Sequence, residues 1–337
     1  MPGTSAPHSL RAWWAQRPPA AGAAVMATGI VSVGLHLAGY EVLSRLTLVV
    51  ACAAWLGLAA DFALRLAREP RRWLREAATP AGLTAVAATT VLGTRFSALG
   101  WQTLAAALLA LSALLWPYLL YAVVRHWHRG MSGAVFLSCV ATQGLAVLGA
   151  TLAAAEASAW LAHAALVLFW LGLVVYAAAL VRFDPRQVTE GAGDHWVAGG
   201  ALSISALAGS ELISADSAAL YLWNNDADDV LHTVTGGLLV LDLAWYAVLM
   251  AAEFVRPRLR YDVRRWATVF PLGMTAAATL SVAAALDASW LEVPGEVLLW
   301  IAVAVWLAVA AGAVREARDY AAADGSPDGG LTSTARR

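Results

Sequence analysis

Ten apolar segments, separated by short polar connections, run through this chain of 337 residues. Each is about 18–26 residues long, so a helix rising about 1.5 Å per residue can cross the ~30 Å hydrocarbon core of a bilayer. The composition agrees, because 60% of the residues are hydrophobic and only 13% are charged, whereas a soluble domain carries about 25% charged residues. We therefore predict an all-α polytopic membrane protein. Its ten transmembrane helices are expected at 20–39, 45–67, 79–96, 99–124, 131–153, 157–182, 195–214, 230–254, 264–286 and 296–316.

The distribution of arginine predicts how these helices are oriented. All 22 basic residues are arginine, and 20 of them fall on one side of the predicted topology, which leaves only Arg45 and Arg95 for the other side. Because positively charged connections stay in the cytoplasm, we expect a multi-pass plasma-membrane protein with both termini cytoplasmic. The chain then divides into a cytoplasmic tail at 1–19, a ten-helix transmembrane domain at 20–316 and a disordered cytoplasmic tail at 317–337.

The odd-numbered and even-numbered segments differ in composition. The odd set holds 13 glycines, 19 serines and threonines and two tryptophans, while the even set holds six glycines, six serines and threonines and eight tryptophans. Small and hydroxylated residues suit close helix packing or a polar path, whereas large apolar side chains and interfacial tryptophans suit contact with lipid. We therefore predict five helical hairpins, each with an inner and an outer helix, around a central pore.

The hydroxyl groups of the inner segments are the candidate lining of that pore. Small residues can serve packing alone, and a single hydroxyl often bonds back to its own helix, but 19 hydroxyl groups exceed what packing needs. As a set they predict a path of neutral hydrogen-bond donors that solvates an anion weakly and lets it pass. The candidate pore-lining residues are Thr28, Ser32, Thr84, Thr89, Thr90, Ser138, Thr142, Gln143, Ser203, Ser205, Thr275 and Thr279.

Few ionisable residues lie within the predicted membrane segments. Asp61 precedes Arg65 by four residues, a spacing that predicts a local ion pair on one helix face. Asp242 falls near the middle of the eighth segment and could carry a coupling proton. Because that segment belongs to the outer set, a hydrogen-bonded structural carboxyl is the competing interpretation.

Several function classes find no support in the sequence. The chain has no His-Glu-x-x-His, Gly-x-Ser-x-Gly or Walker motif, so we expect no catalytic residues and no enzyme. Its histidines include no pair placed for haem, and Cys52 and Cys139 fit buried thiols better than metal ligands, so we expect no cofactor and no metal. The net charge of −1 gives no indication of nucleic-acid binding.

Three stretches of the inner segments resemble a known family. The ninth segment carries the most specific one, and the first and seventh carry weaker ones. Together they are similar to the tellurite-resistance/dicarboxylate transporter family, which includes the plant slow anion channels, yeast malate permeases and fungal sulfite exporters. The stretches are Phe270-Pro271-Leu272-Gly273-Met274 with Ala277-Ala278-Thr279, Ala27-Thr28-Gly29-Ile30-Val31-Ser32, and Leu202-Ser203-Ile204-Ser205-Ala206-Leu207-Ala208-Gly209.

The resemblance implies five hairpins with quasi-fivefold symmetry about a central pore, and a homotrimer. The family places a gating phenylalanine directly before a proline in the ninth helix, and Phe270 with Pro271 matches that position. The implied function is transport of small anions, such as C4-dicarboxylates, sulfite, tellurite-related oxyanions, halides or nitrate. A proton-coupled carrier of C4-dicarboxylates or monocarboxylates is the alternative. More remote alternatives are a receptor without transport and a haem-binding membrane enzyme.

The charge asymmetry also bears on direction. An arginine-rich cytoplasmic face concentrates anions at the inner mouth. The connection on the other side carries Asp216, Asp226, Asp228 and Asp229, which repel them. The sequence therefore favours efflux, although the arginines could serve topology alone.

Overall fold

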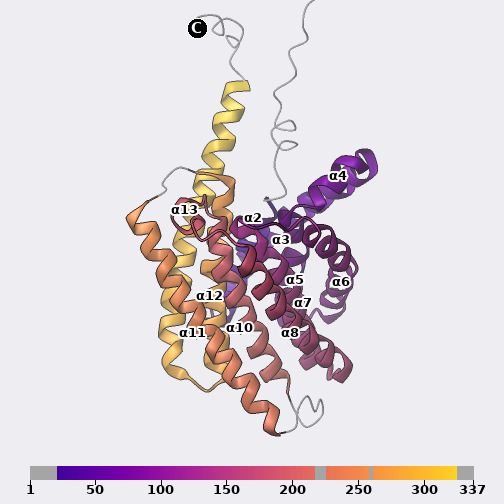
Figure 1. The fold of residues 1–337 in the computed structure, drawn as a ribbon, viewed down its shortest axis with the longest axis vertical. Coiled ribbons are helices and arrows are strands. Elements are labelled where there is room, and N and C mark those ends of the chain that lie inside the picture. Colours follow the sequence, from indigo (N-terminus) through magenta and orange to yellow (C-terminus); the bar gives the residue numbers. More distant parts are fainter. Residues whose placement is uncertain (1–20, 217–224, 258–260, 325–337) are drawn as a thin grey trace, which may run out of the picture.

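Two layers of helices make up the structure (Figure 1). The computed structural model describes residues 21–216, 225–257 and 261–324, and this part of the chain contains no β-strand. We call five of its helices the inner helices: α2 (Gly22–Leu37), α5 (Thr84–Ala98), α7 (Leu137–Glu156), α10 (Val197–Ala215) and α12 (Trp266–Ala285). The outer helices are α3 (Glu41–Arg68), α6 (Gln102–Val124), α8 (Ala159–Arg182), α11 (Asn225–Val255) and α13 (Glu292–Asp324). The all-α prediction is confirmed.

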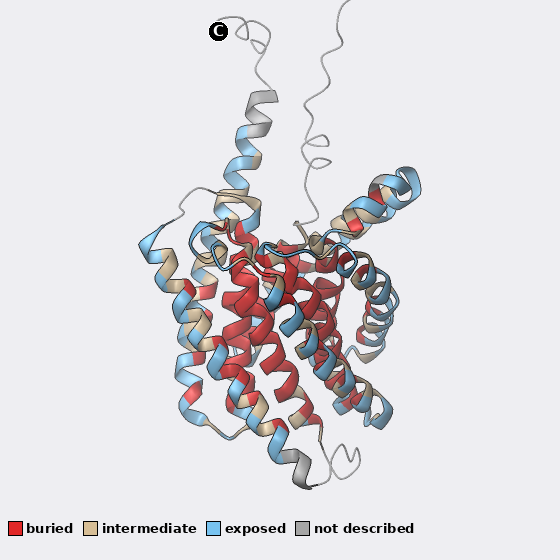
Figure 2. Cartoon of the chain, viewed as in Figure 1, coloured by how far each residue is buried: buried red, intermediate tan, exposed pale blue. Residues whose placement is uncertain are grey.

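Burial separates the two layers. In the most apolar windows of α7, α10 and α12, between 78% and 94% of the residues are buried, against 11–22% in the outer helices. Figure 2 shows the buried residues concentrated in the middle of the bundle. The alternation of small-residue and bulky segments in the sequence therefore corresponds to an alternation of buried and exposed helices.

Packing joins the inner helices into a closed ring. Helix α2 contacts α5 and α12, α7 contacts α5 and α10, and α10 contacts α12. Each inner helix also packs against the outer helix that follows it in the chain. Such antiparallel packing of consecutive helices follows from the short connections between them.

The connections have a repeated local structure. Four inner helices are preceded by a 3₁₀ turn, and four turns from an inner to an outer helix contain a residue in the left-handed backbone region. The preceding turns are η2 (Pro80–Leu83), η3 (Gly133–Phe136), η4 (Asp194–Trp196) and η5 (Val263–Arg265). The left-handed residues are Gly39, Gly100, Ala157 and Asp287. Further short elements are α4 (Pro70–Ala77), α9 (Gln187–Glu190) and η6 (Ser289–Leu291).

The turn before α12 is fixed by Asp262. Its carboxylate accepts hydrogen bonds from the backbone N–H and the guanidinium of Arg264, at 2.9 Å and 2.9–3.1 Å. The hydrogen bonds from the Arg264 side chain are the main cause that lowers the pKa of Asp262 below its ordinary value. This turn therefore holds the start of the helix that carries Phe270.

Eight helices in the described part of the chain are long and apolar enough to cross a membrane. Of the ten inner and outer helices, the two that fall short are inner ones: α2 has 16 residues and α5 has 15. Apart from Arg45, the arginines of the described outer helices gather at the end where the inner helices begin, which we call the arginine-rich end. Helix α13 continues to Asp324, so its last turns overlap the tail expected at 317–337. The expected tail at 1–19 lies outside the described residues.

Candidate functional site

All five inner helices line a small cavity on the axis of the ring. Its volume is about 10 Å³, close to the space that a single water molecule needs. Within the described residues, its lining has no charged side chain, and its only hydroxyls belong to Thr90 and Thr94. No hydrated anion fits this space in the conformation that the structure records. One lining residue from each helix is Ile30, Thr90, Val147, Leu207 and Met274.

Phe270 lies on the same face of α12 as Met274. It precedes Met274 by four residues, which places it one helical turn nearer the arginine-rich end. Its side chain is only 1% exposed. Pro271 follows inside the helix, and because proline has no N–H, the carbonyl of Ala267 loses its usual helical partner.

Three of the predicted pore-lining threonines are bound to outer helices. Each accepts a hydrogen bond from a tryptophan indole and donates to a carbonyl of its own helix. Each of these hydroxyls therefore accepts a hydrogen bond between the two layers and donates one within its own helix. The indole pairs are Trp306 with Thr28 at 3.0 Å, Trp55 with Thr89 at 2.9 Å and Trp116 with Thr142 at 3.0 Å.

Asp242 connects the outer helix α11 to two inner helices. The side chain is fully buried, and its Oδ1 accepts a hydrogen bond of 3.3 Å from the Thr275 hydroxyl. Thr275 in turn lies 3.0 Å from the hydroxyl of Ser203. Asp242 Oδ2 has no hydrogen-bond partner among the described residues. The sequence placed Asp242 on an outer helix away from the ring, whereas its carboxyl group reaches the ring.

The other predicted lining residues occupy different surroundings. Ser32 bonds to Ser44 of α3, and the Gln143 amide donates to the Phe169 carbonyl of α8. Ser205 and Thr279 donate to carbonyls of their own helices. Ser138 Oγ has no partner in the described part of the chain. Thr90 alone of the predicted set lines the axial cavity. For the rest, a place along the path stays a prediction.

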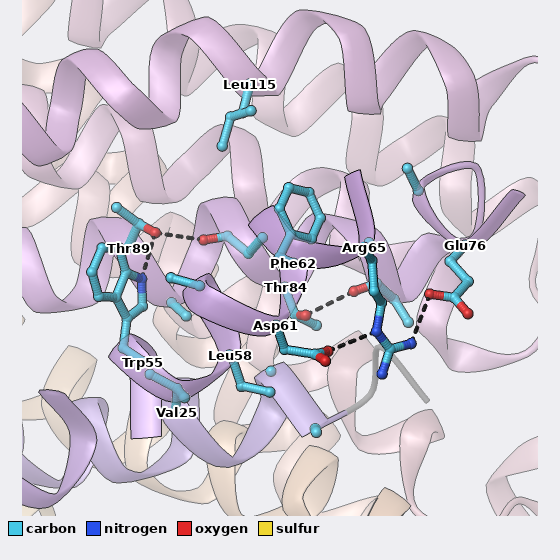
Figure 3. A pocket seen from close by; sticks show the side chains of 18 of the residues that line it. Val25, Trp55, Leu58, Asp61, Phe62, Arg65, Glu76, Thr84, Thr89 and Leu115 are labelled. Carbon is cyan, nitrogen blue, oxygen red and sulfur yellow. Dashed lines mark hydrogen bonds and ion pairs between the residues drawn. The ribbon is translucent and has the colours of Figure 1, made fainter. Parts of the chain in front are cut away.

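A larger cavity of about 300 Å³ lies off the axis, between α2, α3, α4, α5 and α6 (Figure 3). Its walls are mostly apolar, and Thr84 and Thr89 line it. One end carries Arg65, which binds Asp61 at 2.8 Å and Glu76 at 3.1 Å. The predicted ion pair between Asp61 and Arg65 is therefore confirmed, and Glu76 extends it to α4.

Sequence reasoning missed Glu211. It lies near the end of α10, and its carboxylate accepts hydrogen bonds from Thr151 of α7 and Ser281 of α12. One signal was available, because Glu211 is the only ionisable residue between His195 and Asp216. Within the described residues, no group of three or more histidine, cysteine or acidic side chains could hold a metal ion.

A ring of buried helices with a neutral axial cavity, inside a layer of apolar helices long enough to cross a membrane, defines a membrane protein of the channel or transporter class. The model of the voltage-dependent anion channel family matches residues 16–314, so the chain belongs to that family. This confirms the family indicated by the Phe270-Pro271 stretch. Membership supports transport of anions across a membrane.

Two curated relatives are similar to part of the chain. Both are described as uncharacterized membrane proteins of Mycobacterium tuberculosis, one from strain CDC 1551 / Oshkosh and one from strain ATCC 25618 / H37Rv. Each is 31% identical over 147 residues, which cover 40% of this chain and 68% of the relative. They agree with a membrane location.

Proposed function

We propose that the protein conducts small anions along the axis of the five inner helices. The observation that carries this proposal is the axial cavity, which all five inner helices line without a charged side chain in the part of the chain that the structure describes. A neutral path holds an anion weakly, so the anion can leave as readily as it enters. The proposed fold is ten membrane-spanning helices in five hairpins, with α2 and α5 as the two short spans.

Phe270 is the proposed gate, with Pro271 behind it. The inner helices run parallel, because one outer helix separates each from the next along the chain. One turn before the cavity, the other four inner helices therefore place Met26, Val86, Val140 and Gly200 at the level of Phe270. Phe270 is the only aromatic side chain of this layer. A benzyl group there blocks an ion by steric occlusion and dewetting rather than by charge.

The proposed orientation places the arginine-rich end and both termini in the cytoplasm of a plasma-membrane protein. The 20-to-2 division of arginines supports this. The positive charge of the arginine-rich end also favours efflux, since it concentrates anions at the inner mouth of the path. A reporter fused after Arg318 should then be cytoplasmic, and one inserted after Asp216 should be external. An external reporter after Arg318 would overturn the orientation.

A homotrimer is proposed on the family resemblance. The outer helices expose large apolar side chains, among them Leu114 at 78% and Phe254 at 79%, which suit lipid or neighbouring subunits. Crosslinking in native membranes measures the number of subunits.

A proton-coupled carrier is the second candidate. Its supporting observation is the hydrogen bond between Asp242 and Thr275, which links a buried carboxyl group to the helix of the gate. A carrier of this kind needs a titrating group coupled to the path. Asp242 is the candidate for the group that binds and releases the coupled proton.

The deciding experiment is an anion-flux panel in proteoliposomes that contain the full chain. Chloride, nitrate, sulfite, sulfate and malate are tested with and without a pH gradient. Flux driven by the anion gradient alone supports the channel, and uptake that requires the pH gradient supports the carrier. A folded protein that carries none of these anions under either condition would contradict transport.

A further inference from the structure

The side-chain carboxylate of Glu211 lies between three inner helices, α7, α10 and α12. Its Oε2 accepts a hydrogen bond of 3.1 Å from Thr151 of α7, and its Oε1 lies 3.5 Å from the Ser281 hydroxyl of α12. Ser281 itself accepts a hydrogen bond of 2.9 Å from Ser210, next to Glu211 on α10. These contacts hold the carboxylate toward the interior of the ring.

The position of this carboxylate follows from the residues that line the axial cavity. Val147 and Leu207 line the cavity, and Thr151 and Glu211 follow them by four residues on the same two helices. Four residues are about one helical turn, so the second pair lies on the same helix faces about 6 Å further along the axis. Glu211 therefore occupies the next layer of the path, on the side away from Phe270.

Glu211 takes part in no ion pair among the described residues, and hydroxyl groups supply its two hydrogen bonds. At the corresponding end of α2, α3 and α5, the basic side chains of His36, Arg45 and Arg95 bind Glu41. The remaining titratable groups at this end, from the elements packed against α10, are Glu156 of α7, His163 of α8, Asp229 and His232 of α11, Asp216 after α10 and Asp287 after α12.

We propose that Glu211 is a specificity-determining residue that makes the path favour monovalent over divalent anions. This inference rests on the proposed function and narrows its substrate class to monovalent anions, such as halides, nitrate or singly ionised acids. Coulomb repulsion is proportional to the charge of the passing ion. If the carboxylate slows a monovalent anion by a given factor, it slows a divalent anion at the same position by the square of that factor.

The test compares chloride with sulfate in proteoliposomes, using the full chain with Phe270→Ala so that the path is open. Glu211→Gln keeps the carbonyl acceptor for Thr151 but removes the charge. We expect the sulfate-to-chloride flux ratio to rise about tenfold, the effect of one charge at close range in a partly screened site. Glu211→Asp, which keeps the charge, should retain the low ratio.

Glu156→Gln is the matched control, because it removes the same charge from an exposed position at the same end of α7. It should leave the ratio unchanged. A Glu211→Gln protein that conducts with the ratio of its parent would overturn the role of Glu211 and leave the proposed path standing. Absence of both fluxes in every variant and in the unmodified chain would overturn the proposed function, and this inference with it.

A second measurement needs no substitution at Glu211. Lowering the pH on the Glu211 side from about 7 to about 4 protonates carboxylates, while sulfate stays divalent. The sulfate-to-chloride ratio should rise in the parent and stay flat in Glu211→Gln. A ratio in the parent that does not respond to pH would overturn the proposal even if Glu211→Gln failed to fold.

Discussion

Gly200 of α10 lies beside Phe270 of α12, the neighbouring inner helix of the ring. A Cβ atom built on Gly200 would lie 3.3 Å from Cε1 of the Phe270 ring and 2.9 Å from Cγ of Pro271. The second distance is too short for a carbon–carbon contact, so only glycine fits without a shift of its neighbours. The position of the proposed gate therefore depends on the absence of a side chain on the neighbouring helix.

Gly200→Ala should displace Phe270 and Pro271. We expect a loss of stability of about 1–3 kcal/mol from overpacking, together with a changed chloride flux. Thermal unfolding in detergent and proteoliposome flux measure the two effects. Gly237→Ala is the matched control, because nothing lies within 4 Å of a Cβ at that outer-helix position. Equal stability and flux in the Gly200→Ala and parent proteins would contradict the contact.

Phe270→Ala should raise anion flux and leave the ranking of anions unchanged, because truncation opens the path without altering its neutral lining. Removing a buried phenylalanine also costs about 3–5 kcal/mol of packing. Phe169→Ala controls for that cost, since Phe169 is equally buried but lies on the outer helix α8. A well-folded Phe270→Ala protein with unchanged or lower flux would remove Phe270 as the gate.

Asp242→Asn should preserve passive flux within about twofold, because the Asn carbonyl can still accept the hydrogen bond from Thr275 at little cost in free energy. The readout is chloride flux with and without a pH gradient. Thr275→Val serves as a companion, since it removes the same hydrogen bond and keeps the carboxyl group. Loss of pH-driven uptake in Asp242→Asn alone, from a folded protein, would favour the carrier.

Trp306→Phe should lower stability by about 1 kcal/mol through loss of the hydrogen bond to Thr28. Anion selectivity should not change, because Trp306 and Thr28 join the outer layer to the inner layer and neither residue lines the axial cavity. The comparison protein is Trp160→Phe, whose tryptophan is 74% exposed and should be nearly neutral. A changed anion ranking in Trp306→Phe would show that Thr28 faces the path.

Asp262→Asn should reduce stability near neutral pH. The Arg264 side chain lowers the pKa of Asp262, so this carboxylate stabilises the fold above its ordinary pKa of about 3.9. That contribution is lost as the pH falls through the lowered pKa of the folded state. Unfolding curves of the parent and the variant should therefore differ most near pH 7 and converge in acid. A difference that grows in acid would contradict this assignment.

Much of the architecture could be predicted from the chain alone. Segment length and composition indicated apolar helices long enough to span a membrane, and the glycine and tryptophan counts separated the buried helices from the exposed ones. The stretch around Phe270 and Pro271 indicated the family that the comparison then confirmed. These inferences succeed because they depend on properties averaged over whole helices, which require no knowledge of neighbours.

Only the tertiary structure decided which way individual side chains point. An inner helix of 3.6 residues per turn presents one face to the axis and another to an outer helix. Its composition averages the two faces, so Thr28 and Thr90 looked equivalent in the sequence. Packing turned Thr28 toward Trp306 and Thr90 toward the cavity. It also brought Glu211 between Thr151 and Ser281, residues 60 and 70 positions away in the chain, because side-chain direction depends on contacts that local sequence does not encode.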